Sequence, residues 1–518
     1  MTMGVPNSPR QSLEALIGYT PHHDASSKLV IVMVGLPATG KSYVAKKLTR
    51  YLNWLQHKTR VFNVGDRRRE AASHVDDTAP PSLSTSDATF FDPTSPANVS
   101  LRDQLALKTL DELLEWLLRG GGNVGILDAT NSTQARRQLV LGHIRQWQRL
   151  PGGEGQGIKV LFLENRCSDE TIREANIRLK LSGPDYAGKD PEASLADFRR
   201  RVAHYEMAYE PLGAAEEAQG LSFAQMTDAG RKMDTHLIRG YLLSQIAEYL
   251  LNFNLARRQI WLSCHGESLD DREGRIGRYS DLSRRGREYA GALAEFIEAQ
   301  RRRWADEEPI SGHNPESSQF CVWTSTWPQA LQTGASFPAE TYPQTHTKML
   351  DDLNAGAMAG LTRSEVAARH PAEHAARARD RLRYRWPGLG GEGYVDLIVR
   401  LRPLIVELER TTDHIVLITH RAVVRVLAAY FLGIEQDGLG EVRLPRESVY
   451  CFDVVSLDLS HLLSCLLLKT MNESWLRRRG AAQEPYGISF RSFAYDSGLG
   501  AFAQVPNSEI PFIALVNR

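Results

Sequence analysis

The stretch at residues 35–42, which reads Gly-Leu-Pro-Ala-Thr-Gly-Lys-Ser, constrains the fold more strongly than any other part of the chain. An apolar run precedes it at residues 29–34, and a segment with helical character follows it. A glycine-rich loop between a buried strand and a helix is typical of a P-loop, whose backbone N–H groups cradle phosphate oxygens beside the positive end of the helix. The sequence therefore predicts a nucleoside triphosphate site.

Four residues of this loop are expected to bind the nucleoside triphosphate and its Mg2+. Gly35 and Gly40 form the loop, and Lys41 would reach the terminal phosphates. The Ser42 hydroxyl would ligate Mg2+. A chance match to the motif is the alternative, but it seldom comes with a strand before it and a helix after it.

Length and composition limit the remaining possibilities. The 518 residues exceed one compact core, since domains hold roughly 100–200 residues, so we expect two or three domains. The chain has 62 lysine and arginine residues and 62 aspartate and glutamate residues, so its formal net charge is zero. We therefore expect neither nucleic acid nor a membrane as a partner. Five scattered cysteines form no disulfide framework or metal spacing, and no signal peptide or membrane-length apolar run is present. We therefore expect a soluble cytoplasmic protein.

Strand-like and helix-like segments alternate through the first half. Apolar runs predict three further strands, at residues 59–64, 123–128 and 158–163. Apolar residues at helical spacing, or helix-forming composition, predict helices at residues 101–119, 134–148 and 191–209. Another predicted helix contains Asn176 and Lys180. The alternation favours an α/β fold with a doubly wound, mostly parallel sheet.

The composition of the first half also predicts where its segments begin and end. A polar leader at residues 1–27 is expected to be flexible, and the P-loop domain is expected to cover residues 28–256. Residues 71–99 have a loop-like composition and predict an insert, and residues 211–220 also resemble a loop.

Two polar features of the first half point to phosphoryl transfer. Asp128 ends a predicted strand, where a P-loop kinase needs a carboxylate near Mg2+ and the transferred group, although such an aspartate also commonly caps a helix. The basic run at residues 67–69 follows another strand, where it would suit a second anionic ligand or form a solvated surface. Arg201 and Tyr205 lie four residues apart on one helix face.

The second half begins another α/β unit, expected over residues 257–460. The strand at residues 257–263 is followed by Cys264 and His265, and the strand at residues 413–419 ends at His420. The two histidines would either converge in one pocket, where one attacks phosphorus, or serve separately as loop or capping residues. Residues 461–518 are expected to form a loop-like tail, for which we have no functional account.

Several stretches, in order along the chain, resemble the bifunctional 6-phosphofructo-2-kinase/fructose-2,6-bisphosphatase family. In the first half they are residues 35–42, 46–54, 61–65, 128–131 and 184–186. In the second half they are residues 265–267, 274–277, 322–325, 332–333 and the region of His420. The resemblance implies a P-loop kinase domain, then a histidine-phosphatase domain with the α/β fold of phosphoglycerate mutases, and a homodimer.

For the first half, the resemblance implies phosphoryl transfer from Mg-ATP to the 2-hydroxyl of fructose 6-phosphate. Lys41, Asp128 and Cys167 match positions at the kinase site, Asp128 also at the metal, and Asn176 matches a nucleotide position. The residues that match contacts to the sugar phosphate are Arg68, Arg69, Arg102, Thr130, Arg136, Lys180, Arg201 and Tyr205. Thr39 stands where an arginine is usual, which bears on affinity or rate.

For the second half, the resemblance implies that His265 is the nucleophile, with His420 beside it. Asp352 takes the place of the usual glutamate acid, and the residues that match substrate contacts are Arg275, Arg377 and Arg381. However, Cys264 and Gln329 stand where clamping arginines are expected, and Asp271 replaces an asparagine that faces the phosphate. Loss of one bidentate arginine typically reduces the rate on the order of a hundredfold or more. We therefore expect bisphosphatase activity to be absent or vestigial.

Three hypotheses follow from the sequence. The leading one is a 6-phosphofructo-2-kinase with a degenerate phosphatase domain. The second is a fully bifunctional enzyme that tolerates the substitutions. The third is a non-catalytic sensor of ATP or sugar phosphates, against which the intact Lys41, Ser42 and Asp128 argue.

Overall fold

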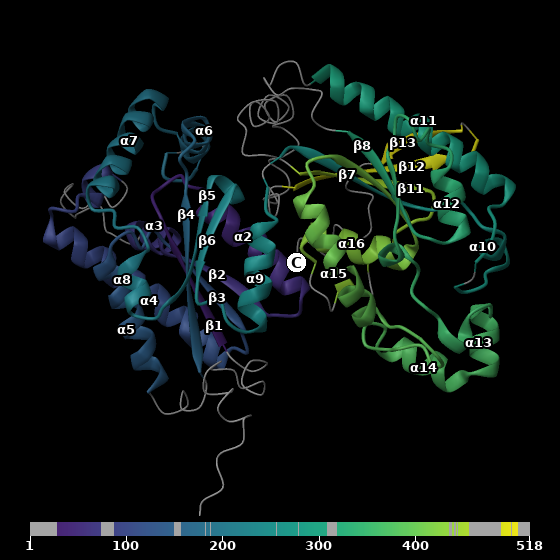
Figure 1. The fold of residues 1–518 in the computed structure, drawn as a ribbon, viewed down its shortest axis with the longest axis horizontal. Coiled ribbons are helices and arrows are strands. Elements are labelled where there is room, and N and C mark those ends of the chain that lie inside the picture. The colour runs from purple at the N-terminus through teal and green to yellow at the C-terminus, as the bar shows by residue number, and fades with distance from the viewer. Residues whose placement is uncertain are drawn as a thin grey trace, which may run out of the picture. The chain divides into compact units, whose positions relative to one another are not determined.

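The computed structural model describes residues 28–73, 87–149, 157–307, 319–454 and 488–505, apart from residues 182, 187, 255, 278, 435–437, 440, 441, 443 and 499. The expected leader at residues 1–27 therefore lies outside the described residues. Apart from residues 54–56, the chain divides into one compact unit that reaches Phe253 and a second that begins at Asn254 (Figure 1).

The first unit is built on a six-stranded sheet with the order β2-β3-β1-β4-β5-β6. Its strands are β1 Lys28–Val34, β2 Thr59–Asn63, β3 Val124–Asp128, β4 Ile158–Arg166, β5 Ser222–Thr227 and β6 Lys232–His236. All neighbours are parallel except β5 and β6. The prediction of a mostly parallel sheet is confirmed. The strands β1 and β3 are neighbours, so the loops that follow them lie at the same edge.

Helices cover both faces of this sheet, and Figure 1 shows α4 and α5 on one side with α2 and α9 on the other. The helices are α2 Lys41–Trp54, α3 Val64–Ser73, α4 Pro96–Arg119, α5 Gln134–Gln148, α6 Glu170–Leu181, α7 Pro191–Met207, α8 Ala214–Ala218 and α9 Tyr241–Leu251. Two short 3-10 turns, η2 Ala88–Phe91 and η3 Asp228–Gly230, complete the unit. Leu113 and Leu117 of α4 pack in one core with Val32 and Leu127 of the sheet.

Two predicted loops of the first unit are partly helical. The prediction of a loop-like insert at residues 71–99 is wrong at both ends of that range, because α3 reaches Ser73 and α4 begins at Pro96. The start of α4 is set by Ser95, whose side chain accepts from Asn98 N, and by proline at the first helical position. The loop predicted at residues 211–220 contains α8, which is too short to show helical periodicity. Residues 74–86 lie outside the described part of the chain.

The second unit has a seven-stranded sheet with the order β13-β12-β11-β7-β10-β8-β9. Its strands are β7 Arg258–Cys264, β8 Phe320–Thr324, β9 Gln344–His346, β10 His414–Thr419, β11 Ser448–Val454, β12 Ile488–Asp496 and β13 Ala501–Val505. The loop-like tail predicted after residue 460 is therefore wrong for β12 and β13, which pair antiparallel next to β11. The physical reason is burial, since Phe493 packs in the core with Trp261 and Cys451.

The helices of the second unit include two long ones, α11 Arg284–Glu307 and α15 Tyr394–Arg410. The others are α10 Leu269–Glu273, α12 Pro328–Gly334, α13 Arg363–Arg369, α14 Pro371–Arg379 and α16 Arg421–Leu432, with 3-10 turns η6 Lys348–Leu350 and η7 Gly356–Met358. Among the described residues of the whole chain, no helix combines the length and the apolar character needed to span a membrane.

Candidate functional site

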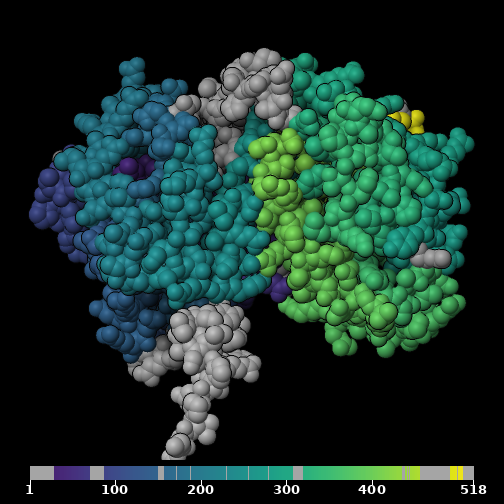
Figure 2. Space-filling view, in the orientation of Figure 1, coloured from purple at the N-terminus to yellow at the C-terminus, as the bar shows by residue number. Residues whose placement is uncertain are grey.

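The P-loop of the first unit joins β1 to α2 in a shape that requires glycine. Gly35 has a φ of 132°, and a Cβ atom there would lie 2.5 Å from the carbonyl oxygen of Asn165. Gly40 has a φ of 84° immediately before α2 begins at Lys41. The first turn of α2 therefore presents backbone N–H groups toward the loop, as a phosphate cradle needs. Figure 2 shows a hollow in this unit with atoms of the purple N-terminal segment, which includes the loop, at its floor.

Lys41 lies among charged groups from three other elements. Burial lowers the pKa of Lys41 to about 7, Asp128 opposes this shift, and the charges of Lys180 and Arg201 add to it. The Lys41 ammonium group donates to the carbonyl oxygen of Leu36. Lys41 therefore interacts electrostatically with three other residues of the predicted site.

Asp128 is fixed by the neighbouring strand. It ends β3 and is buried, and its register partner on β2 is Asn63. The Asn63 amide donates to Asp128 Oδ2 at 2.8 Å. Because β3 pairs with β1, the end of β3 lies at the sheet edge where the P-loop begins. An oxygen ligand in this position, together with the Ser42 hydroxyl, has the chemistry that Mg2+ prefers.

Three of the predicted sugar-phosphate arginines converge on one carboxylate. Asp185 lies 2.5 Å from Arg68, 3.2 Å from Arg69 and 3.2 Å from Arg201. Burial raises the pKa of Asp185, but the three guanidinium groups outweigh it and hold the pKa at about 2. Arg68 and Arg69 come from α3 and Arg201 from α7, so Asp185 joins the two helices. Asp185 lies in the stretch at residues 184–186 that resembles the family, but no role was predicted for it.

Phe91 holds a second group of predicted residues together. The Arg102 guanidinium donates to the Phe91 carbonyl oxygen at 2.9 Å, and the Arg201 guanidinium lies 3.9 Å from the centre of the Phe91 ring. The Tyr205 ring lies 5.6 Å from the same ring, centre to centre. Phe91 was missed because it falls in the predicted insert, where only its paired aromatic neighbour Phe90 hinted at a buried turn.

Three other predicted site residues of the first unit have contacts outside the arginine cluster. The Thr130 carbonyl accepts from the Gly35 N–H at 2.8 Å and so fixes the start of the P-loop. Asn176 is buried in α6. Arg136, on α5, forms an ion pair with Asp103 of α4.

Cys167 is not an ionised thiol. Burial, followed by the charges of Asp228 and Asp169, raises the pKa of Cys167 to about 11. Its thiol donates to the carbonyl oxygen of Asp169 at 3.4 Å. Because the thiol is neutral near pH 7, the structure gives Cys167 no nucleophilic character, and its role at the kinase site stays a prediction.

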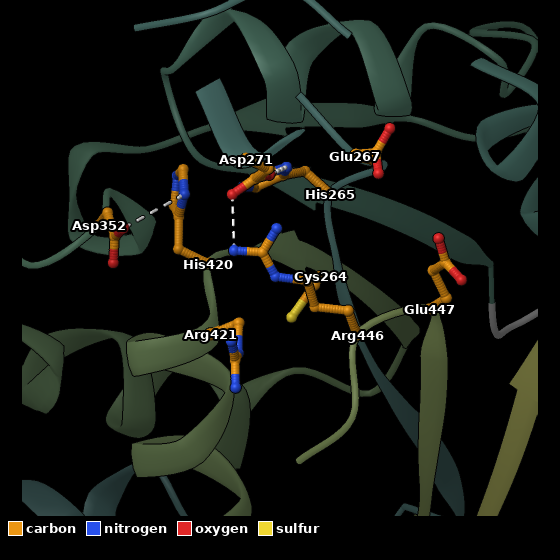
Figure 3. A pocket seen from close by; sticks show the side chains of 9 residues that line it. All are labelled: Cys264, His265, Glu267, Asp271, Asp352, His420, Arg421, Arg446 and Glu447. Atoms are coloured by element: carbon orange, nitrogen blue, oxygen red, sulfur yellow. Dashed lines mark ion pairs between the residues drawn. The ribbon is translucent and has the colours of Figure 1, made fainter. Parts of the chain in front are cut away.

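The second unit contains a cavity of about 90 Å3 at the ends of β7 and β10 (Figure 3). The residues that line it are Cys264, His265, Glu267, Asp271, Asp352, His420, Arg421, Arg446 and Glu447. The two strands are parallel neighbours with Cys264 opposite Thr419, so the residues that follow them meet. The rings of His265 and His420 lie 4.9 Å apart, centre to centre. Of the two alternatives for these histidines, the structure shows convergence.

Both histidines are held by hydrogen bonds and are neutral. His265 Nδ1 lies 2.7 Å from the Gly266 carbonyl oxygen, which indicates that Nδ1 carries the proton. His420 Nε2 lies 2.8 Å from Ser325 Oγ. Burial lowers the pKa of both rings, and Asp271 partly opposes the shift at His265. A neutral His265 is the form that can attack phosphorus.

Asp352 has the properties of a proton donor. Its Oδ2 lies 4.0 Å from His420 Nδ1. Burial raises the pKa of Asp352 to about 6, against a hydrogen bond from the Leu353 N–H and with a further contribution from Asp271. A carboxyl group that is partly protonated near neutral pH can act as a general acid.

The positive charge expected around these residues is weak. Burial raises the pKa of the Cys264 thiol to about 11, so it is neutral, and Gln329 is buried with its Oε1 3.4 Å from the Ser280 N–H. Arg446 lies in the cavity but pairs with Asp271 at 2.6 Å. Arg421 and Arg446 were missed by the sequence analysis. Arg421 directly follows His420 and could have been found from that position, whereas nothing marks Arg446.

Three predicted substrate arginines are absent from the nine residues that line the cavity. Arg275 pairs with Glu273 at 2.8 Å and donates to the Gly360 carbonyl at 2.9 Å. The guanidinium groups of Arg377 and Arg381 lie over the rings of Trp386 and Tyr394. Their proposed contacts to a substrate stay predictions.

Comparisons with known proteins cover both units. The family model described as 6-phosphofructo-2-kinase matches residues 18–257, and the one for the histidine phosphatase superfamily (branch 1) matches residues 260–456. The fold predicted for each half is thereby confirmed.

Curated relatives match across both halves. The "6-phosphofructo-2-kinase 1" of Saccharomyces cerevisiae is 42% identical over 499 residues, which cover 95% of this chain and 55% of that protein. This chain therefore spans about half the length of that relative. A "probable 6-phosphofructo-2-kinase" of Schizosaccharomyces pombe is 37% identical, with 93% of this chain and 72% of the relative covered. The "6-phosphofructo-2-kinase/fructose-2,6-bisphosphatase" of Gallus gallus is 38% identical, with 81% of each chain covered. The chain belongs to the 6-phosphofructo-2-kinase/fructose-2,6-bisphosphatase family.

Proposed function

We propose that the first unit transfers a phosphoryl group from ATP to the 2-hydroxyl of fructose 6-phosphate and so forms fructose 2,6-bisphosphate. The observation that carries this proposal is the convergence of Arg68, Arg69 and Arg201 on one carboxylate, that of Asp185. The charges of Arg201, Lys180 and Asp128 also act on the P-loop Lys41. A donor site and an arginine cluster suited to a sugar phosphate thus lie side by side. Relatives named as 6-phosphofructo-2-kinases support the choice of substrate.

The donor half of the site would hold Mg-ATP. The backbone N–H groups at the start of α2 and the Lys41 ammonium would bind the phosphates. Ser42 and Asp128 would ligate Mg2+, which when bound neutralises charge on the phosphates. Because ATP brings negative charge to Lys41, the Lys41 amine would take up a proton and be cationic in the complex.

The acceptor half would bind the sugar phosphate through arginine. Arg68, Arg69 and Arg201 share one buried carboxylate, Asp185, and Arg69 also pairs with the exposed Asp66. Cationic charge therefore remains for a phosphate dianion, which guanidinium groups bind in bidentate fashion. Arg102 and Tyr205, held by Phe91, would complete this pocket. Asp128 would then accept a hydrogen bond from the attacking hydroxyl.

The experiment that tests this proposal measures fructose 2,6-bisphosphate formed from Mg-ATP and fructose 6-phosphate. Wild-type protein should form it, and Asp128→Ala should lose at least about a thousandfold in kcat while remaining folded. A folded wild-type protein that forms no product would overturn the kinase proposal and leave the sensor hypothesis standing.

We further propose that the second unit does not hydrolyse fructose 2,6-bisphosphate at a useful rate. Two arginines face four carboxyl groups in the cavity, and Asp271 pairs with one of the arginines. Such a lining repels a phosphoryl group that needs a ring of positive charge. The converging histidines and the raised pKa of Asp352 favour the bifunctional alternative. Hydrolysis of fructose 2,6-bisphosphate by the same preparation at a rate typical of the family would decide for that alternative.

Two further expectations are carried forward as proposals, a homodimer from the resemblance and a cytoplasmic location from the composition. The chain forms a homodimer, which sedimentation equilibrium tests directly by mass. It acts in the cytoplasm, where its sugar-phosphate substrate is expected, and fractionation of cells with an antibody to the chain tests that location.

A further inference from the structure

The second cavity contains an ion pair that neither the sequence nor the proposed function requires. Arg446, two residues before β11, reaches across the cavity, and its Nη2 lies 2.6 Å from Asp271 Oδ1 (Figure 3). The side chain of Asp271 is largely buried at 13% exposure, whereas that of Arg446 is 43% exposed. The pair therefore lies at the boundary between the cavity and solvent.

Asp271 holds this position through both carboxylate oxygens. Its Oδ2 accepts from the Ser268 N–H at 3.1 Å, in the capping box that starts α10. The same Oδ2 lies 3.9 Å from His265 Nδ1. Burial raises the pKa of Asp271, but the charge of Arg446 and the hydrogen bonds from Ser268 act against burial, and the pKa lies below its usual value. An ionised carboxylate thus stands beside the predicted nucleophile.

The charge balance of the cavity depends on this pair. Of the four carboxyl groups in the lining, Glu447 pairs with Arg285 at 2.7 Å and Glu267 accepts from Ser283 Oγ at 2.7 Å. A hydrogen bond from a hydroxyl leaves the Glu267 charge in place, so Glu267, Asp271 and Asp352 remain to face Arg421 and Arg446. Asp271 therefore cancels the charge that Arg446 would otherwise offer to an anion.

The cavity is large enough for an oxyanion. A single water needs about 10–15 Å3 of such space, and the cavity offers about 90 Å3. A tetrahedral phosphoryl group would fit this space beside His265, but it would have to compete with Asp271 for the Arg446 guanidinium.

We propose that Arg446 is a phosphoryl-binding residue whose guanidinium group is occupied by Asp271. The Asp271 carboxylate takes the place of a bound phosphoryl group. The proposal rests on the proposed function in one respect, since it explains why the second unit binds phosphoryl groups poorly. It assigns the defect to a carboxylate that is present as well as to the arginines missing at positions 264 and 329.

Asp271→Asn is the variant that separates these causes. The asparagine side-chain oxygen can still accept from the Ser268 N–H, so the cap of α10 persists. The substitution removes the negative charge that pairs with Arg446 and leaves a guanidinium beside His265.

The experiment titrates inorganic phosphate into the full-length protein by calorimetry and compares wild type, Asp271→Asn and the double variant Asp271→Asn/Arg446→Ala. All three share an unchanged first unit, so phosphate bound there contributes equally. We expect Asp271→Asn to bind phosphate on the order of tenfold more tightly than wild type. The double variant should return to the wild-type affinity.

Two results would overturn the proposal. The first is a folded Asp271→Asn protein, verified by circular dichroism and thermal melting, that binds phosphate no more tightly than wild type. The second is a double variant that keeps the gain, because removal of negative charge alone would then explain it. If Asp271→Asn does not fold, Asp271→Ser retains a capping oxygen and serves the same comparison. Assays of wild-type kinase and hydrolase activity test the proposed function separately from this titration.

Discussion

The Asp185 carboxylate lies 3.2 Å from the guanidinium of Arg201, and this ion pair ties the turn after α6 to the middle of α7. The same carboxylate also contacts Arg68 and Arg69 of α3. The side chain of Asp185 is only 13% exposed, so these are partly buried ion pairs, whose strength depends on geometry more than that of surface pairs. Asp185 therefore sets the spacing of the arginines before a substrate arrives.

Asp185→Asn should raise the KM for fructose 6-phosphate on the order of tenfold, with a smaller effect on the KM for ATP, because it releases the three arginines from a common anchor. Steady-state kinetics with each substrate varied in turn measures the two constants. Asp66→Asn is a matched control, since Asp66 pairs with Arg69 at the surface with 65% of its side chain exposed. The control should change neither constant by more than about twofold. Equal changes in both KM values for Asp185→Asn would contradict this role.

Nucleotide binding should take up a proton at Lys41. Burial lowers the pKa of Lys41 to about 7, despite the opposing charge of Asp128. The phosphates of ATP would raise this pKa, so binding favours the protonated amine and the affinity for Mg-ATP falls as the pH rises above about 7. Calorimetry at pH 8 in two buffers with different heats of ionisation measures the proton uptake.

Lys41→Arg supplies the control for that measurement. Arginine stays charged at pH 8, so the Lys41→Arg variant should take up no proton when it binds Mg-ATP. We expect it to bind Mg-ATP more weakly than wild type and with the same heat in both buffers. Identical heats in both buffers for the wild-type protein would show that Lys41 is already charged before ATP binds.

Much of the donor site could be predicted from the sequence because local pattern determines it. The motif at residues 35–42, between a strand and a helix, predicts a P-loop conformation of the backbone. Asp128 could be placed because it ends an apolar run that predicts a buried strand. The parallel order of the sheet then brings Lys41 and Asp128 to one edge. Strand and helix periodicity were sufficient for these elements.

The residues that hold the arginines could not be predicted in the same way. Phe91 lies in a stretch whose composition indicates a loop, and its role depends on contacts with α4 and α7 that no local pattern encodes. Arg446 and Asp271 meet only after the second sheet has formed. The strands β12 and β13 were missed because polar residues interrupt their apolar pattern, among them Arg491 and Ser492 in β12 and Gln504 in β13.

Phe91→Ala should weaken both the fold and the acceptor pocket. Phe91 is 3% exposed, and loss of a buried phenylalanine side chain typically lowers the free energy of unfolding by about 3–5 kcal/mol. It also removes the ring beneath Arg201, so the KM for fructose 6-phosphate should rise. Phe91→Leu restores apolar volume without an aromatic face. It should recover much of the stability but keep a raised KM, and a normal KM in Phe91→Leu would rule out a role for the ring itself.

Asp352→Asn should stabilise the second unit at neutral pH. Burial, with a contribution from Asp271, raises the pKa of Asp352 from 3.8 to about 6. The folded chain therefore holds this proton to a higher pH than the unfolded chain, so stability falls as the pH rises from about 4 to about 6 and stays lower above that range.

The gain from Asp352→Asn should be about 1–3 kcal/mol at pH 7.5 and close to zero at pH 4, because the wild-type carboxyl is already protonated there. Thermal melting at the two pH values measures it. Asp351→Asn is the neighbouring control, since Asp351 accepts from the Thr326 N–H at 2.7 Å and its replacement should destabilise the protein at pH 7.5. A lower melting temperature for Asp352→Asn at pH 7.5 would mean that Asp352 is stabilised as a carboxylate, in which case it could not act as a general acid.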